Sequence, residues 1–160
     1  MNIKNIKLWI IYKEEIGFSR MIAEMLQDRL EDYIDVYVGN AKRIDPIFLV
    51  EESFDCLIIG DVIIETIPSS EIQDWMLKYR EIAEKNNLVV KKVSGFYVAP
   101  SDIKTEPSWI GFLQENIKAE MIYPPILNLK LNREAIALED GALELVKAYS
   151  KDFIEFFIEK

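Results

Sequence analysis

The sequence contains no histidine and only one cysteine among its 160 residues. Without histidine, the chain lacks the side chain that most often acts as a general base near neutral pH, and it lacks the commonest metal ligand. It also lacks every Ser–His and Cys–His pair that could activate a nucleophile. A structural zinc site, which draws its ligands mainly from cysteine and histidine, is excluded for the same reason.

The single cysteine, Cys56, cannot form an internal disulfide and lies in the middle of an apolar segment. A free cysteine in such a segment behaves as a small hydrophobic residue far more often than as a reactive thiol. We therefore expect Cys56 to be part of the core.

Basic residues are scarce: 19 lysines and arginines face 28 aspartates and glutamates, which gives a formal net charge of -9 at pH 7. Nucleic-acid binding needs a basic surface that neutralises phosphates, so this balance argues against it. The same excess of negative charge opposes docking on an anionic membrane. It suits an encounter with a basic protein, because complementary charges steer association. We predict no nucleic-acid or membrane partner, and we expect a basic redox or regulatory protein.

Long hydrophobic runs are absent as well. The longest apolar stretches, residues 8–12 and 56–60, are far too short to span a bilayer. The N-terminus shows no apolar segment with a small-residue cleavage site, so we expect no secretory signal and a cytoplasmic protein. With 160 residues, half of them hydrophobic, the chain is expected to form a single domain over residues 1–160.

Apolar segments of strand length alternate with segments of helical period, a pattern typical of a parallel sheet built from βαβ units. The predicted strands are residues 6–12, 33–38, 55–60, 88–98 and a fifth strand at 119–123 that is interrupted by Pro124-Pro125 and resumes at 126–131. The predicted helices are residues 21–30, 46–51, 70–85, 107–118 and 138–158. This alternation predicts an α/β fold with a three-layer, doubly wound parallel sheet. Five strands in 160 residues match the version of that fold whose strand order is 2-1-3-4-5.

Two helix starts carry capping signals. Asp45-Pro46 has the form of an N-cap followed by proline at the first helical position. Ser70 and Gln73 have the spacing of a capping box, which makes Ser70 the expected cap of its helix.

The strand order also predicts the position of a ligand site. In doubly wound sheets, ligands bind beyond the carboxyl ends of the strands, at the point where the strand order reverses. Here that point lies between the first and third strands. We therefore expect any ligand to contact the loops 13–20, 61–66 and 97–102.

Three stretches of sequence fit this site to a known pattern. Residues 11–24 read IYKEEIGFSRMIAE and place a glycine and a serine between an apolar strand and a helix. Residues 55–69 read DCLIIGDVIIETIPS, and residues 91–96 read KKVSGF. All three resemble the flavodoxin family, the last more weakly. The resemblance implies a flavodoxin-like fold with an FMN site in the same three loops.

The resemblance assigns the FMN phosphate to the loop of Lys13, Glu14, Ile16, Gly17, Phe18, Ser19 and Arg20. The family pattern there is Ser/Thr-x-Thr-Gly-x-Thr, ahead of a helix N-terminus that favours anions. Gly17 and Ser19 keep the pattern, whereas Glu14 and Ile16 replace two hydroxyls. The carboxylates of Glu14 and Glu15 would therefore repel an FMN phosphate placed in this loop. At about 4 Å, two like unit charges repel by roughly 1 kcal/mol in water and about 4 kcal/mol at an effective dielectric constant of about 20. Lys13 and Arg20 can offset this repulsion only if their side chains turn inward.

The other two loops depart from the family pattern too. Asp61, Val62 and Ile64 stand where the family places Ser-Pro and an aromatic residue. Ile63 and Ile64 can cover a flavin face but lack aromatic stacking geometry. Tyr97 and Trp109 are the candidate stacking rings for the third loop, and the alternative role of Tyr97 is that of a core residue.

Blander interpretations apply to the same carboxylates. Glu14 and Glu15 can be solvated loop charges, and Asp61 can cap a turn or the following helix. A divalent cation held by Asp61, Glu65 and Glu14 or Glu15 is a further alternative, although we assign no metal ligands and no catalytic residues.

Two functions follow from these features. The first is a flavodoxin-like binding or regulatory module whose FMN site has degenerated, so that FMN binds weakly or not at all. The alternative is an FMN-binding electron carrier or small flavin reductase, which needs no histidine or catalytic cysteine because the flavin performs the redox chemistry.

Overall fold

The structure, a computed structural model, describes residues 5–13, 17–63, 67–102, 109–123 and 126–158. The strands are β1 (Lys7–Tyr12), β2 (Asp35–Asn40), β3 (Cys56–Val62), β4 (Val90–Pro100), β5 (Ala119–Ile122), β6 (Leu127–Asn132) and β7 (Ala137–Leu138). The helices are α1 (Phe18–Leu30), α2 (Pro46–Glu52), α3 (Ser70–Lys85), α4 (Trp109–Asn116) and α5 (Ala142–Ile158). No helix within these ranges is long and apolar enough to cross a membrane.

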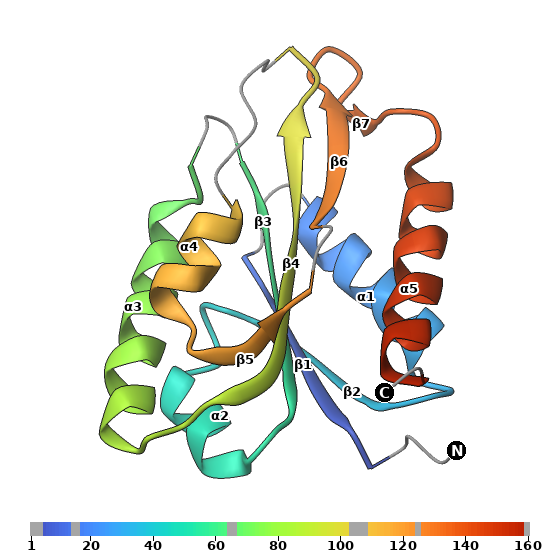
Figure 1. Cartoon of the computed structure of the whole chain (residues 1–160). Helices are drawn as coiled ribbons and strands as arrows, with labels where there is room; N and C mark the ends of the chain where they lie inside the picture. Colours follow the sequence, from blue (N-terminus) through green and yellow to red (C-terminus); the bar gives the residue numbers. More distant parts are fainter. Residues whose placement is uncertain (1–4, 14–16, 64–66, 103–108, 124–125, 159–160) are drawn as a thin grey trace.

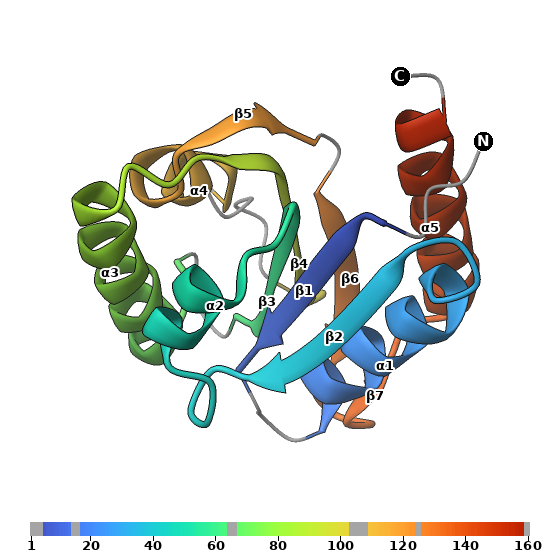
Figure 2. The same ribbon diagram turned by 90° about the horizontal axis from the view of Figure 1, so that it is seen from below.

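The strands form one sheet in the order β2-β1-β3-β4-β6-β7, with β5 also paired to β4. Helices α1 and α5 cover one face, and α2, α3 and α4 cover the other (Figures 1 and 2). Each face of the sheet has its own apolar core, because successive side chains of the central strands point to opposite faces. The predicted three-layer α/β fold and the order 2-1-3-4-5 are confirmed, because β5 and β6 together occupy the fifth position.

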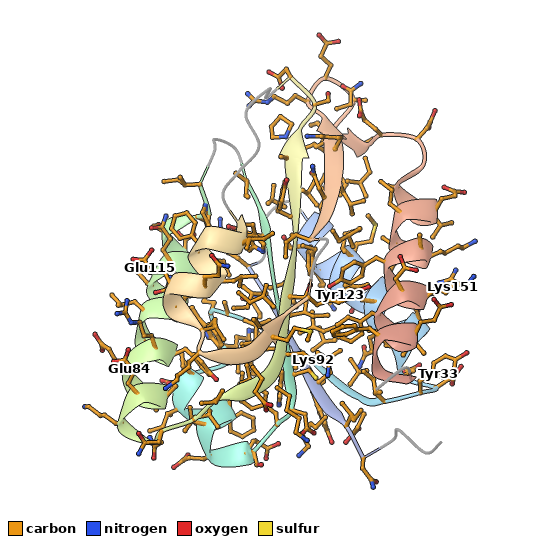
Figure 3. The ribbon with its side chains drawn as sticks, in the orientation of Figure 1. Tyr33, Glu84, Lys92, Glu115, Tyr123 and Lys151 are labelled. Atoms are coloured by element: carbon orange, nitrogen blue, oxygen red, sulfur yellow. The ribbon has the colours of Figure 1, made fainter. Side chains whose placement is uncertain are left out.

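The fifth strand is interrupted as expected. β5 pairs with the first half of β4, and β6 pairs with its second half, both in parallel. Near the break, the buried Ser94 hydroxyl donates to the carbonyl of Tyr123 at 3.2 Å and lies 2.6 Å from the Tyr149 hydroxyl. Tyr123, labelled in Figure 3, packs its ring against Phe153 of α5. These contacts hold the chain at the break onto the α5 side of the sheet.

Several element boundaries differ from the prediction. Within the described residues the sheet has seven strands instead of five, because the fifth strand is divided into β5 and β6 and because Ala137–Leu138 forms a short antiparallel strand against β6. The last helix therefore begins at Ala142 and not at residue 138. Helix α3 is capped by Ser69, whose hydroxyl accepts from the Ile72 N–H, and not by Ser70. The predicted Asp45 cap of α2 is confirmed by its bond from the Ile47 N–H at 3.0 Å.

The turn between β6 and β7 contains a β-branched residue in the left-handed region. Ile136 has φ 50°, and its side chain is 64% exposed. This conformation costs a β-branched residue about 1–2 kcal/mol, whereas asparagine tolerates it. We expect Ile136→Asn to raise the free energy of unfolding by about 1 kcal/mol in urea denaturation. Ile136→Val, which stays β-branched, is expected to bring no gain, and an equal gain from both variants would contradict the strain.

Candidate functional site at the carboxyl edge of the sheet

The chain segments that follow β1, β3 and β4 lie side by side at the carboxyl edge of the sheet. The Lys13 N–H donates to the carbonyl of Gly60 at 3.1 Å, and the Ile63 N–H donates to the carbonyl of Val98 at 2.7 Å. Backbone pairing therefore continues past the strand ends and sets the start of each loop in a fixed register. The described parts of the predicted loops are neighbours at the point where the strand order reverses.

The start of α1 keeps two features suited to an anion. Gly17, the N-cap, has φ 83°, and a Cβ at this position would meet no atom of the described residues within 4 Å. Ser19, in the first turn, is fully buried, and its Oγ has no hydrogen-bond partner among the described residues. The first N–H groups of a helix also lack intrahelical acceptors. Phe18 is half-buried against the core on the α1 and α5 side.

The two cations that flank this loop are both paired with carboxylates. Arg20 Nε lies 3.4 Å from Glu24 Oε2 on the exposed surface of α1, so its side chain follows the helix. Lys13 Nζ lies 3.3 Å from Glu71 Oε2, in the first turn of α3. The hydrogen bond from Lys13 lowers the pKa of the Glu71 carboxyl below its usual range. Lys13 thus links the end of β1 to the start of the helix that follows β3.

Asp61 is a buried carboxylate at the end of β3. Its Oδ2 accepts from the N–H of Ser69 at 2.7 Å, and its Oδ1 has no partner among the described residues. Burial raises the pKa of Asp61 to about 6, against the lowering effects of Ser69 and of the positive charge of Lys13. Because Ser69 is the N-cap of α3, this bond supports the interpretation of Asp61 as a residue that fixes the start of that helix.

Ile63 and Tyr97 belong to the core on the α3 and α4 side. Both are buried, and the Tyr97 ring lies 6.2 Å from the Trp109 ring, between centroids. The core role of Tyr97 is therefore the one that the structure supports. Cys56 is also buried as expected, and burial raises the pKa of its thiol to about 12, which leaves almost no thiolate near neutral pH.

Some of the predicted site residues lie outside the described residues, namely Glu14, Ile16 and Ile64, together with the Glu15 and Glu65 of the alternative cation site. Within the described ranges, no three side chains of the metal-binding types come together.

Sequence reasoning missed Ser69 and Glu71 as site residues. The capping-box spacing of Ser70 and Gln73 pointed to Ser70, one residue beyond the serine that caps α3. The Lys13–Glu71 ion pair joins residues far apart in the chain, and nothing in the local sequence around either residue indicates it.

Solved structures similar to this chain identify the fold. No protein-family model and no curated protein matches the sequence. Flavodoxin 2 from Bacillus cereus superposes with a TM-score of 0.73 at 19% identity, covering 93% of this chain and 98% of that one. The chain has the fold of a flavodoxin. A flavodoxin from the domain Archaea gives a TM-score of 0.71 at 17% identity, over 94% of this chain and 97% of its own.

The flavodoxin fold also occurs within longer proteins. The rubredoxin oxygen:oxidoreductase from Desulfovibrio gigas matches 93% of this chain with a TM-score of 0.70 at 12% identity, and the match covers 35% of that protein. At such identities the likeness shows the fold alone, so the function must be argued from the residues of the site.

Proposed function

We propose that this protein is a binding or regulatory module of flavodoxin fold that acts through the loops at the carboxyl edge of its sheet and does not hold FMN in the usual way. The observation that carries the proposal is the orientation of the Lys13 side chain. It forms an ion pair with Glu71 on α3, and its charge also lowers the pKa of the buried Asp61 carboxyl. Its partner is proposed to be a basic regulatory or redox protein, in keeping with the net charge of -9.

The described residues fit poorly to a phosphate dianion. Exposed pairs at i, i+4 contribute only a few tenths of a kcal/mol, so the Arg20–Glu24 pair is a weak obstacle. Lys13 is different, because its side chain is mostly buried and it moderates the cost of burying Asp61. Moving Lys13 to a phosphate would take from the buried Asp61 carboxyl a positive charge that lowers its pKa, and such a loss is expensive.

The described residues also offer no side chain that is free to cover the flavin ring of FMN. Ile63 and Tyr97, the described residues that could cover a flavin, pack inside the α3 and α4 core. A side chain that fills a close-packed core cannot also offer its face to a ligand without leaving a cavity.

An FMN-binding electron carrier or small flavin reductase is the second candidate, and one observation favours it. Gly17 keeps the left-handed conformation at the start of α1, and the buried Ser19 Oγ has no partner among the described residues. Both features suit a phosphate at a helix N-terminus.

Titration with FMN separates the two functions. Purified protein is expected to be colourless, and added FMN is expected to keep its free fluorescence at micromolar protein. A yellow preparation, or complete quenching of FMN fluorescence at that concentration, would show that the protein binds FMN and overturn the proposal of a degenerate site.

Restoring the family pattern in the first loop should create FMN affinity. Glu14→Thr with Ile16→Thr removes one carboxylate and adds two hydroxyl donors. With about 1 kcal/mol or more for each bond to the phosphate, the double variant is expected to bind FMN tens of fold more tightly. Flavin fluorescence in low-salt titrations of both proteins measures the change.

Glu81→Thr is the matched control for this pair, because it removes an exposed carboxylate from α3 away from the loop. It should leave FMN affinity at the level of the natural sequence. Equal affinities of the double variant and the natural protein would show that the first loop does not control the site.

A further inference from the structure

Among the described residues, no strand pairs with the outer edge of β2. β2 is the terminal strand of the sheet, and Figure 2 shows no strand beyond it. The Asp35 N–H donates to Ile6 and the Ala41 N–H donates to Tyr12, which sets the odd-numbered residues toward β1. Because a parallel strand alternates its bonding direction, the backbone groups of Val36, Val38 and Asn40 point outward.

This edge carries few of the features that protect sheet edges in monomeric proteins. Such edges are usually shortened, bulged, covered, or lined with proline or lysine. β2 reads DVYVGN, with neither proline nor lysine. Its described outer contacts are a long bond of 3.4 Å from Gln27 Nε2 to the Val36 carbonyl and the turn bonds that Asn40 accepts from residues 43 and 44. At the opposite end of the sheet, the two-residue strand β7 closes the edge against β6.

Exposed apolar side chains gather beside the edge. Tyr37 is 36% exposed and stacks on Trp9 with 5.3 Å between ring centroids, and Phe48 is 44% exposed and meets the same ring edge-on at 5.8 Å. Ile47, in the first turn of α2, is 47% exposed. Tyr33, which precedes the start of β2 and is labelled in Figure 3, is 48% exposed on the side of α1. Apolar clusters of this kind mark interaction surfaces.

The charges at the two ends of β2 are opposite. Glu31 and Asp32 precede the strand, and Lys42 and Arg43 follow it, all of them exposed. Among the described residues, none of the four takes part in an ion pair. A strand that is acidic at its start and basic at its end is complementary to a second copy of itself running in the opposite direction.

We propose that β2 pairs with β2 of a second copy of this chain, antiparallel about a two-fold axis at Val38, so that the two sheets become one. In this register Val38 faces its own copy, Val36 faces Asn40, and each acidic end lies against a basic end. A two-fold interface requires such self-complementarity, because the same patch serves on both sides. The charge pattern therefore favours a second copy over the strand of another protein.

Charge reversal tests the pairing. Lys42→Glu with Arg43→Glu makes both ends of the edge acidic, and Glu31→Lys with Asp32→Lys makes both ends basic. The natural protein is expected to be a dimer by light scattering coupled to size exclusion, and each double variant a monomer. An equimolar mixture of the two variants is expected to be dimeric again, because both ends then attract.

Lys147→Glu with Lys151→Glu is the matched control, since it reverses two exposed charges on α5, a helix that packs against α1 and β6. This control should stay dimeric. A monomeric natural protein, dimeric single-sign variants, or a mixture that fails to reassociate would each overturn the proposal. The first of these outcomes would leave the edge to a strand of another protein.

Amide exchange gives a readout that does not depend on the charges. Raising the protein concentration is expected to slow exchange at the N–H groups of Val36 and Val38, which face outward, and to leave the inward Tyr37 N–H unchanged. Exchange that is independent of concentration at Val36 and Val38 would contradict the pairing.

Discussion

Gly60→Ala is expected to destabilise the domain by about 3 kcal/mol or to prevent folding, because a Cβ at this position would fall inside the ring of Phe96. Gly60 and Phe96 are direct partners in the register of β3 and β4, the two central strands of the sheet. Phe96 is fully buried in the core on the α1 and α5 side, so its ring has no free space to enter. The loss is measured by urea unfolding followed by circular dichroism.

A double-mutant cycle identifies the cause of this loss. Phe96→Leu removes the ring and is expected to destabilise the domain by about 1–2 kcal/mol through lost packing. In the double variant, the new methyl group occupies part of the space that the ring leaves. The double variant should therefore lose less stability than the two single variants lose together, with a coupling energy of about 1–3 kcal/mol. Additive losses would show that the glycine is needed for its backbone and not for the ring.

This pair also shows what the sequence can and cannot predict. A glycine at the end of an apolar strand is visible in the sequence, and so is an apolar Phe96 in the next strand. Their direct opposition depends on the register between β3 and β4, which pattern alone does not fix. The alternation of apolar and helical segments was enough to predict the layers, because parallel strands need crossover connections that are usually helices. The strand order followed from the number of strands and the chain length, which match one version of the doubly wound fold. The proline pair at 124–125 likewise predicted the interrupted fifth strand.

The candidate site divides in the same way. Its position follows from the strand order, so sequence reasoning could place it beyond β1, β3 and β4. Its electrostatics depend on where long side chains turn, and Lys13 could have met a ligand or Glu71 with the same local sequence. The short β7 was missed because two residues give no periodicity, and a helix starting at residue 138 fitted the apolar pattern equally well.

Asp61→Asn is expected to gain stability relative to the natural protein as the pH rises from about 4 to about 6. Burial raises the pKa of Asp61 from 3.8 in the unfolded chain to about 6 in the folded domain. Between these values the folded protein binds the proton more tightly than the unfolded chain does. The natural protein therefore loses stability as the pH rises through this window, by about 3 kcal/mol for a shift of about two units.

The variant has no carboxyl at position 61 and does not lose this stability. Its side-chain oxygen can still accept the bond from the Ser69 N–H, so the start of α3 is kept. The difference in unfolding free energy, variant minus natural protein, is expected to climb between pH 4 and 6 and to be level above about pH 7. Urea denaturation at a series of pH values measures it.

Asp45→Asn provides a control of opposite sign. The hydrogen bond from Lys78 and the bond from the Ile47 N–H lower the pKa of this exposed cap below 3.8. The stability that Asp45 contributes is therefore present above its unfolded pKa and is lost as the pH falls. The natural protein consequently becomes more stable relative to this variant as the pH rises. A difference curve for Asp61→Asn that is flat, or that runs in the same direction as the one for Asp45→Asn, would mean that Asp61 is solvated or fully compensated. Asp61 would then no longer be a reason why an anionic ligand binds poorly at this edge, and FMN binding would become the better-supported function.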